Sequence, residues 1–264
     1  MSKTRKVLLI LLALAVLKMP LDTLLAAILP DAAVDPMPGC IAGMVLSLLT
    51  MGLPAWLLRP WTSPRLMRQK SAWRGPVLAA VAALWVRAAM APADAAWQSA
   101  LGLTPDPMPV PESMPLAMLY IAALVIIPAL TEEAFFRGAL LTGMLDGSRR
   151  ITAVLLTAMA FVLMHGSLAN LPSLLALSLM LTLLMLHAGR LAVPVTAHLV
   201  YNLTALLNWQ APDLTGSIAC GVLAIVLAVN FCAAQPKIAH QPMKKPDGLI
   251  AAAAIAVLVT LYFI

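Results

Sequence analysis

Apolar runs long enough to cross a lipid bilayer recur along almost the whole chain. About 20 consecutive apolar residues are needed for a helix to span the hydrocarbon layer. Short segments rich in charge or proline separate these runs, and 62% of the residues are hydrophobic whereas 11% are charged. The sequence therefore predicts an all-α integral membrane protein, a polytopic transmembrane helical bundle without a soluble domain.

About nine spans are predicted, and eight if one of the less clearly bounded runs does not cross. We expect one membrane-embedded domain over residues 1–264. The expected spans are 7–29, 38–58, 76–96, 115–145, 151–169, 171–186, 191–209, 214–234 and 249–264.

The distribution of lysine and arginine predicts how the chain is oriented. With a cytosolic N-terminus, every lysine and arginine outside the spans falls on the inner side, whereas Asp31, Glu112 and Asp213 fall on the outer side. The net charge of +6 is then explained by topology and by contact with anionic lipid. The lipid bilayer is an expected partner, and nucleic acid is not.

Three ionisable residues interrupt the apolar stretch 130–138. Charge within a membrane is costly, so such residues indicate a functional site. On a helix, Glu133 and Arg137 are four residues apart and share a face, which predicts an ion pair. Glu132 points about a quarter-turn away and has no partner on its own helix. Its position predicts a general base.

Further polar residues lie in two later spans. His165 follows Phe161 by four residues, and His198 precedes Asn202 by four, so each pair shares a helix face. Folding an antiparallel hairpin about a turn near 147–148 brings Glu132 level with His165. We therefore expect these polar groups to form one site in the inner half to the middle of the membrane.

The motifs Glu-Glu-x-x-x-Arg, Phe-x-x-x-His and His-x-x-x-Asn occur in that order on separate predicted helices. Together they resemble the CPBP family of intramembrane proteases, also called Abi, which includes CAAX prenyl endoproteases and lysostaphin resistance protein A-like proteins. The resemblance covers about 115–209, the expected protease core.

The resemblance implies an endopeptidase that hydrolyses a peptide bond near the cytosolic side of the membrane. It implies that Glu132 and His165 activate a water, and that His198 and Asn202 form the oxyanion site. The expected substrate is a peptide or a membrane-associated protein. We expect the protein in a bacterial cell membrane, and the sequence favours no particular oligomeric state.

Three alternatives remain open. A zinc-dependent protease would use Glu132, His165 and His198 as ligands, but the His-Glu-x-x-His signature is absent and no metal or other cofactor is expected. A proton-coupled transporter would use Glu132, Glu133 and Arg137 as a relay, but it predicts inverted repeats that the sequence does not show. The third alternative is a non-catalytic scaffold that keeps the motifs.

Overall fold

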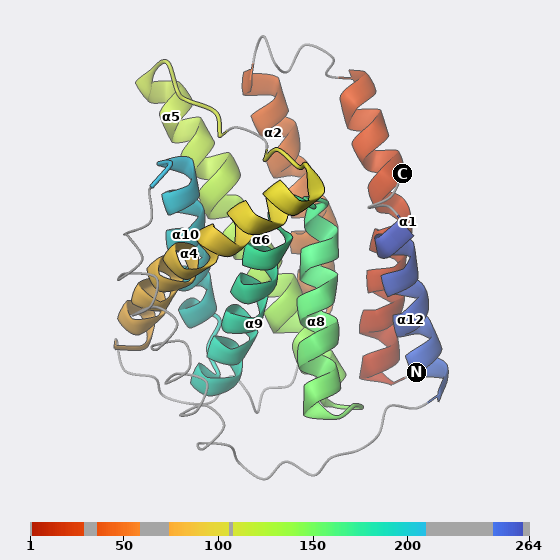
Figure 1. Cartoon of the computed structure of the whole chain (residues 1–264). Helices are drawn as coiled ribbons and strands as arrows, with labels where there is room; N and C mark the ends of the chain where they lie inside the picture. The colour runs from red at the N-terminus through yellow and green to blue at the C-terminus, as the bar shows by residue number, and fades with distance from the viewer. Residues whose placement is uncertain (1, 29–35, 59–73, 106–107, 210–244, 261–264) are drawn as a thin grey trace.

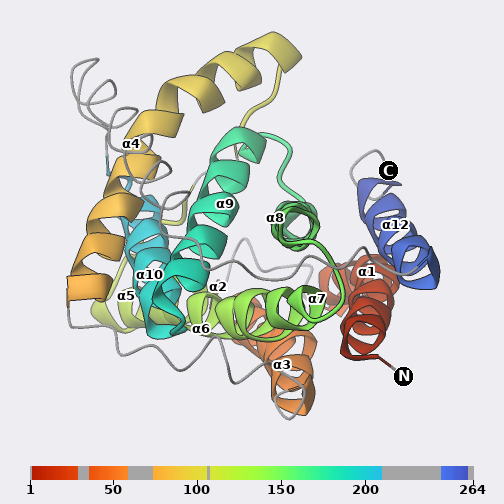
Figure 2. The same ribbon diagram turned by 90° about the horizontal axis from the view of Figure 1, so that it is seen from below.

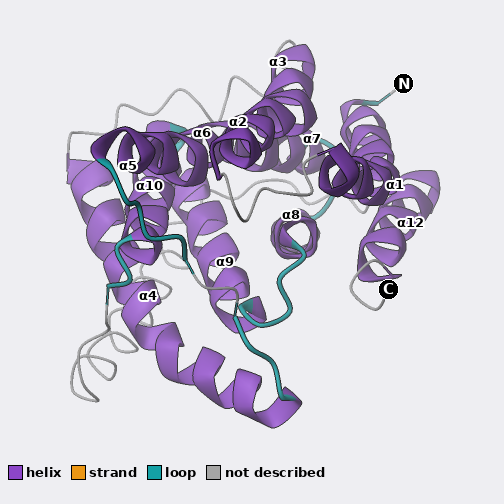
Figure 3. Ribbon diagram, turned by 90° about the horizontal axis from the view of Figure 1, so that it is seen from above, coloured by secondary structure: helices purple, strands orange, loops and turns teal. Residues whose placement is uncertain are grey.

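The structure is a computed structural model that describes residues 2–28, 36–58, 74–105, 108–209 and 245–260. All regular elements in these ranges are helices, and no strand occurs within them (Figure 3). The predicted span over 214–234 lies outside the described residues.

Two long helices contain both α-helical and π-helical segments. One runs over Pro36–Leu58 and the other over Met114–Leu145. The first consists of α2 (Pro36–Ser47), the π-helical segment η1 (Leu48–Gly52) and α3 (Leu53–Leu58). The second consists of α5 (Met114–Tyr120), the π-helical η3 (Ile121–Ile126), α6 (Ile127–Glu133), the π-helical η4 (Ala134–Leu141) and α7 (Thr142–Leu145).

The other helices are α-helical throughout. They are α1 (Lys3–Ile28), α4 (Arg74–Leu101), α8 (Arg150–His165), α9 (Leu171–Ala188), α10 (Ala192–Leu206) and α12 (Lys245–Thr260). The helix α8 ends four residues before the predicted limit of its span, because Gly166 has a φ of 66° and lies in the left-handed region that closes helices.

Four helices in the described part of the chain are long and apolar enough to cross a membrane: Pro36–Leu58, Gly75–Leu101, Met114–Leu145 and Leu171–Ala188. Three shorter apolar helices cover Arg150–His165, Ala192–Leu206 and Asp247–Val257. Large apolar side chains such as Trp56, Leu78 and Met118 are exposed on the outer surface, where a bilayer would cover them. The protein is a helical membrane protein.

The helices α1 and α12 lie side by side at one edge of the molecule (Figures 1 and 2). Nε of Arg5 and Oδ1 of Asp247 are 2.9 Å apart and join these helices. On its other side α1 packs against α7, where the Thr4 hydroxyl donates to the Gly143 carbonyl at 2.9 Å. A Cβ at Gly143 would lie 2.7 Å from Val7 Cγ1, so this close approach requires glycine.

The core lies where η4, α8 and α9 meet. The rings of Phe135, Phe136 and Phe161 are fully buried there. Phe136 contacts both other rings edge to face, with ring centroids 5.1 and 5.2 Å apart, which is a favourable aromatic arrangement. This packing fixes α8 against the long helix that carries the glutamates.

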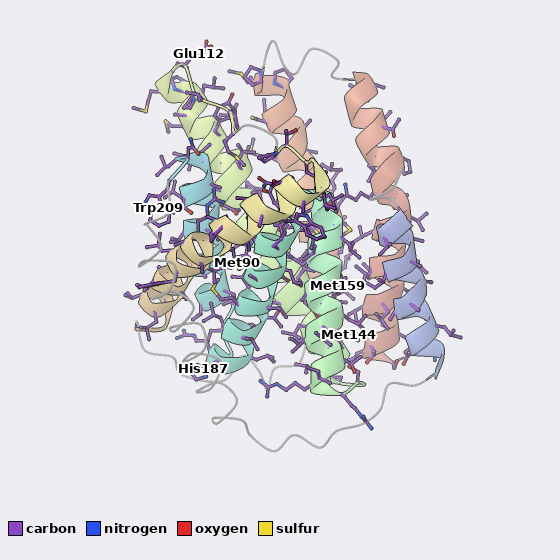
Figure 4. All side chains as sticks on the ribbon, viewed as in Figure 1. Met90, Glu112, Met144, Met159, His187 and Trp209 are labelled. Carbon is purple, nitrogen blue, oxygen red and sulfur yellow. The ribbon has the colours of Figure 1, made fainter. Side chains whose placement is uncertain are left out.

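The helix α4 crosses obliquely over α9 and also contacts α10 (Figures 1 and 3). The two ends of the bundle differ in the residues they present. His187 lies at the same end as the N-terminus of α1, and Glu112 lies at the opposite end (Figure 4). His187 is thus at one end of the bundle.

Candidate active site

The two glutamates occupy the last two positions of α6, and Arg137 lies in the π-helical segment η4 that follows. Short π-helical segments within α-helices are frequent at functional sites. Both Glu133 and Arg137 have fully buried side chains. Nη1 of Arg137 lies 2.8 Å from Oε1 of Glu133, so the two form the ion pair that their spacing predicts.

Groups from two further helices complete the surroundings of this pair. Nη2 of Arg137 donates to the carbonyl and to the hydroxyl of Ser178 on α9, both at 2.9 Å. The guanidinium carbon lies 4.5 Å from the centroid of the Phe161 ring, within cation–π range. Oε1 of Glu133 is also 2.9 Å from Nδ1 of His198 on α10. Glu133 therefore connects α6 to both η4 and α10 through its contacts with Arg137 and His198.

Glu132 has a different environment from its neighbour. Its side chain keeps 17% of its surface exposed, whereas that of Glu133 keeps none. Oε2 of Glu132 lies 3.5 Å from Nε2 of His165 and 4.0 Å from Nε2 of His198. This oxygen is buried and has no hydrogen-bond partner among the described residues. The structure thus brings together an acid and two imidazoles from three different helices.

The hydrogen bonds of the two imidazoles determine which ring nitrogen carries a hydrogen. Nδ1 of His165 lies 2.8 Å from the Phe161 carbonyl, which can only accept, so Nδ1 must be the donor. Nδ1 of His198 lies beside the Glu133 carboxylate, which is paired with Arg137. A carboxylate can only accept, so Nδ1 of His198 is also assigned as a donor. In the neutral rings, both Nε2 lone pairs then point toward Glu132. A water molecule between these acceptors could donate to two of them at once.

Asn202 lies one helical turn beyond His198 on α10 and is half-buried. The amide of Asn202 can donate hydrogen bonds whatever the charge of its surroundings. His198 can donate through Nε2 only when both ring nitrogens carry hydrogen. Of the two residues expected at the oxyanion site, Asn202 is thus the donor that needs no protonation step.

A second set of polar contacts, which the sequence reading did not identify, holds the segment after His165. Nε1 of Trp97 donates to the Leu168 carbonyl at 2.9 Å, and Nε2 of Gln98 donates to the Ala169 carbonyl at 3.0 Å. Oδ1 of Asp94 accepts from the backbone N–H of Ser173 at 3.0 Å. These three side chains lie on one face of α4, and we call them the α4 clamp.

The spacing of the α4 clamp was a signal available in the sequence. Positions 94, 97 and 98 are three and four residues apart and share a face, as polar residues with a common partner should. Their partners, however, are backbone carbonyl and N–H groups, which every residue has and which the sequence therefore does not indicate. The contact of Arg137 with Ser178 was missed for a related reason, because a single serine in an apolar helix usually bonds its own backbone.

Glu132, His165 and His198 are the side-chain types of a His2Glu zinc site. In the part of the chain that the structure describes, no group of three or more His, Cys, Asp or Glu residues has metal-binding geometry. The expectation of a metal-free site stays a prediction.

Residues 114–204 match the family described as type II CAAX prenyl endopeptidase Rce1-like. Over these residues the chain is similar to the CAAX protease family. The match begins at the start of α5 and ends within α10, so it includes both glutamates, both histidines of the site, Arg137 and Asn202. The helices α1 to α4 and α12 lie outside it. No curated protein and no solved structure matches the chain.

Proposed function

We propose that this protein is an intramembrane endopeptidase that uses a water activated by Glu132 and His165. The observation that supports this most strongly is the distance of 3.5 Å between Oε2 of Glu132 and Nε2 of His165. Of the two adjacent glutamates, Glu132 is the one whose side chain is partly exposed. A carboxylate within hydrogen-bond reach of a shared water is the arrangement that general-base catalysis requires.

The reaction proceeds by proton transfer and addition. Glu132 accepts a proton from the water, and the oxygen adds to the carbonyl carbon of the scissile peptide bond. The carbonyl oxygen becomes an oxyanion, which accepts a hydrogen bond from the Asn202 amide, with the His198 imidazole as the second group of the oxyanion site. The proton on Glu132 then passes to the leaving nitrogen as the carbon–nitrogen bond breaks. The products are a carboxylic acid and an amine.

The substrate is a peptide or a membrane-associated protein, and the bond is cleaved near the cytosolic side of a bacterial cell membrane. Nine spans with a cytosolic N-terminus would place the end of the bundle that carries His187 in the cytosol. This orientation is supported by the basic residues between the predicted spans.

The test of the catalytic assignment is Glu132→Gln in the purified, membrane-reconstituted protein. The variant should keep its fold and lose cleavage of an apolar peptide library, as followed by mass spectrometry. His187→Gln is the matched control, since it removes a titratable side chain at the end of the bundle. Cleavage by Glu132→Gln at the wild-type rate would refute the assignment.

A zinc-dependent protease is the second candidate. The observation that favours it is that both imidazoles hold Nδ1 on an acceptor and direct Nε2 toward Glu132, as histidine ligands of zinc commonly do. We favour the metal-free mechanism because the motifs resemble those of glutamate-dependent members of the CPBP family.

A further inference from the structure

The helix that contains α2 and η1 packs against α6 (Figure 3), and Thr131 lies at this contact. Oγ of Ser47 is 2.6 Å from Oγ1 of Thr131. The Thr131 hydroxyl donates its one hydrogen to the Ile127 carbonyl at 2.8 Å, within its own helix. It must therefore accept from the Ser47 hydroxyl, so a hydrogen bond joins the two helices. Thr131 directly precedes Glu132, the proposed general base.

Gly52, at the other end of η1, makes a second contact with Thr131. A Cβ built on Gly52 would lie 3.3 Å from Cγ2 of Thr131, which is closer than ordinary van der Waals contact. Residues five apart in an α-helix are roughly 140° apart around the axis. The i→i+5 hydrogen bonds of a π-helix bring such residues nearer to alignment. One of these bonds runs from the Leu53 N–H to the Leu48 carbonyl. The π-helical geometry of η1 thus lets Ser47 and Gly52 both face Thr131.

The position of the Glu132 carboxylate depends on the backbone that carries it. Oε2 of Glu132 has no hydrogen-bond partner among the described residues. The helix α6 has only 7 residues and lies between two π-helical segments, η3 and η4. Moving the boundary of either segment by one residue would rotate Glu132 about the helix axis, because the two kinds of helix differ in their hydrogen-bond register. Contacts with other helices select one rotation, and those at Thr131 lie next to Glu132.

We propose that Ser47 and Gly52 are positioning residues for the general base. Through Thr131, they hold α6 in the rotation that places Glu132 beside His165. This inference rests on the proposed protease function. A misplacement of about 1 Å can lower a rate by about 10²-fold, so the distance of 3.5 Å between Glu132 and His165 has to be held closely. Both positioning residues lie in a helix outside the segment that is similar to the CAAX protease family.

Substitutions of Ser47 test the hydrogen bond. Ser47→Ala should lower kcat about tenfold, because a small rotation of α6 moves the base, while KM stays near its wild-type value. Ser47→Thr keeps the hydroxyl donor and should retain kcat. Thr50→Val is the matched control on the same helix, because the Thr50 hydroxyl donates to the Leu46 carbonyl at 2.8 Å and not to α6. It should alter neither constant. Steady-state kinetics on a peptide that the wild type cleaves would measure both.

A steric substitution and its rescue test the contact at Gly52. Gly52→Ala should also lower kcat, because its Cβ would push Thr131 by a few tenths of an ångström. Thr131→Ser keeps the hydroxyl and removes Cγ2, so it should restore kcat when combined with Gly52→Ala. Gly43→Ala is the matched control, because a Cβ at that glycine would meet nothing within 4 Å. Its kcat should equal that of the wild type.

The competing explanation is that these contacts only hold the two helices together. Wild-type kcat in both Ser47→Ala and Gly52→Ala would support it and overturn the positioning role, while the protease proposal would stand. A loss in Gly52→Ala that Thr131→Ser does not relieve would also overturn the positioning role. So would an effect of Ser47→Ala on KM alone. If the wild type cleaves no peptide, the protease proposal fails and the positioning role fails with it.

Discussion

Oε1 of Glu133 lies 2.9 Å from Nδ1 of His198 and joins α6 to α10 across 65 residues of sequence. The same oxygen is 2.8 Å from Nη1 of Arg137. One acid of the pair is thereby committed to holding the helices together. Its neighbour Glu132 faces His165 and is the acid that we propose for proton transfer.

Glu133→Gln should lower the free energy of unfolding by about 3 to 5 kcal/mol, because it leaves the buried Arg137 without its counter-charge. Chemical unfolding in a mild detergent would measure the loss. Lys3→Gln is the control, since it breaks a surface pair with Asp146 and should cost about 1 kcal/mol or less. Equal stability of Glu133→Gln and the wild type would contradict the role of this ion pair.

Asn202→Ala should reduce kcat by about 10² to 10³, the range seen when one oxyanion donor is removed. KM should hardly change, because a donor aimed at the developing oxyanion contributes little to binding the substrate. Steady-state kinetics on a cleaved library peptide would measure both constants. Leu203→Ala, at an exposed position on α10, should alter neither. An effect on KM alone would assign Asn202 to substrate binding.

Trp97→Phe should reduce kcat several-fold while KM stays near its wild-type value. The substitution keeps an aromatic ring and removes only the indole N–H that holds the Leu168 carbonyl, a loss of about 1 kcal/mol in stability. The segment after His165 would then be less well held. Trp56→Phe is the control, because Trp56 is 64% exposed on the outer surface. Equal kcat values for the two variants would make the α4 clamp purely structural.

Exhaustive chelation should leave the activity of the purified protein intact, and elemental analysis should find no stoichiometric zinc. The reason is that the proposed mechanism activates water with Glu132 and His165 alone. Activity that is lost to a chelator and restored by added zinc would transfer this role to a metal bound by Glu132, His165 and His198.

A reporter inserted in the basic segment 59–73 should face the cytosol, and one inserted in the proline-rich segment before α5 should face the opposite side. Membrane-impermeant labelling of single cysteines at the same positions provides an independent measurement. Both reporters on one side would mean that α4 does not cross the membrane.

Local patterns in the sequence determined much of the helical structure and of the pairing within helices. Hydropathy predicted helices wherever the structure describes them, since a backbone in lipid must satisfy its own hydrogen bonds. The i,i+4 spacing predicted the contact of Glu133 with Arg137, because it depends only on helix geometry. Counting residues about the turn near 147–148 brought Glu132 level with His165, since the two helices form a hairpin.

Only the tertiary structure decided which faces of helices distant in sequence meet. The rotation of α10 turns His198 toward Glu133, and that of α9 turns Ser178 toward Arg137. The packing of α1 brings Lys18 beside Gly166. Helix periodicity fixes which residues share a face, but the direction in which that face points depends on side-chain packing summed over several helices. In an apolar chain many such packings bury similar surfaces, so the sequence pattern alone does not select one.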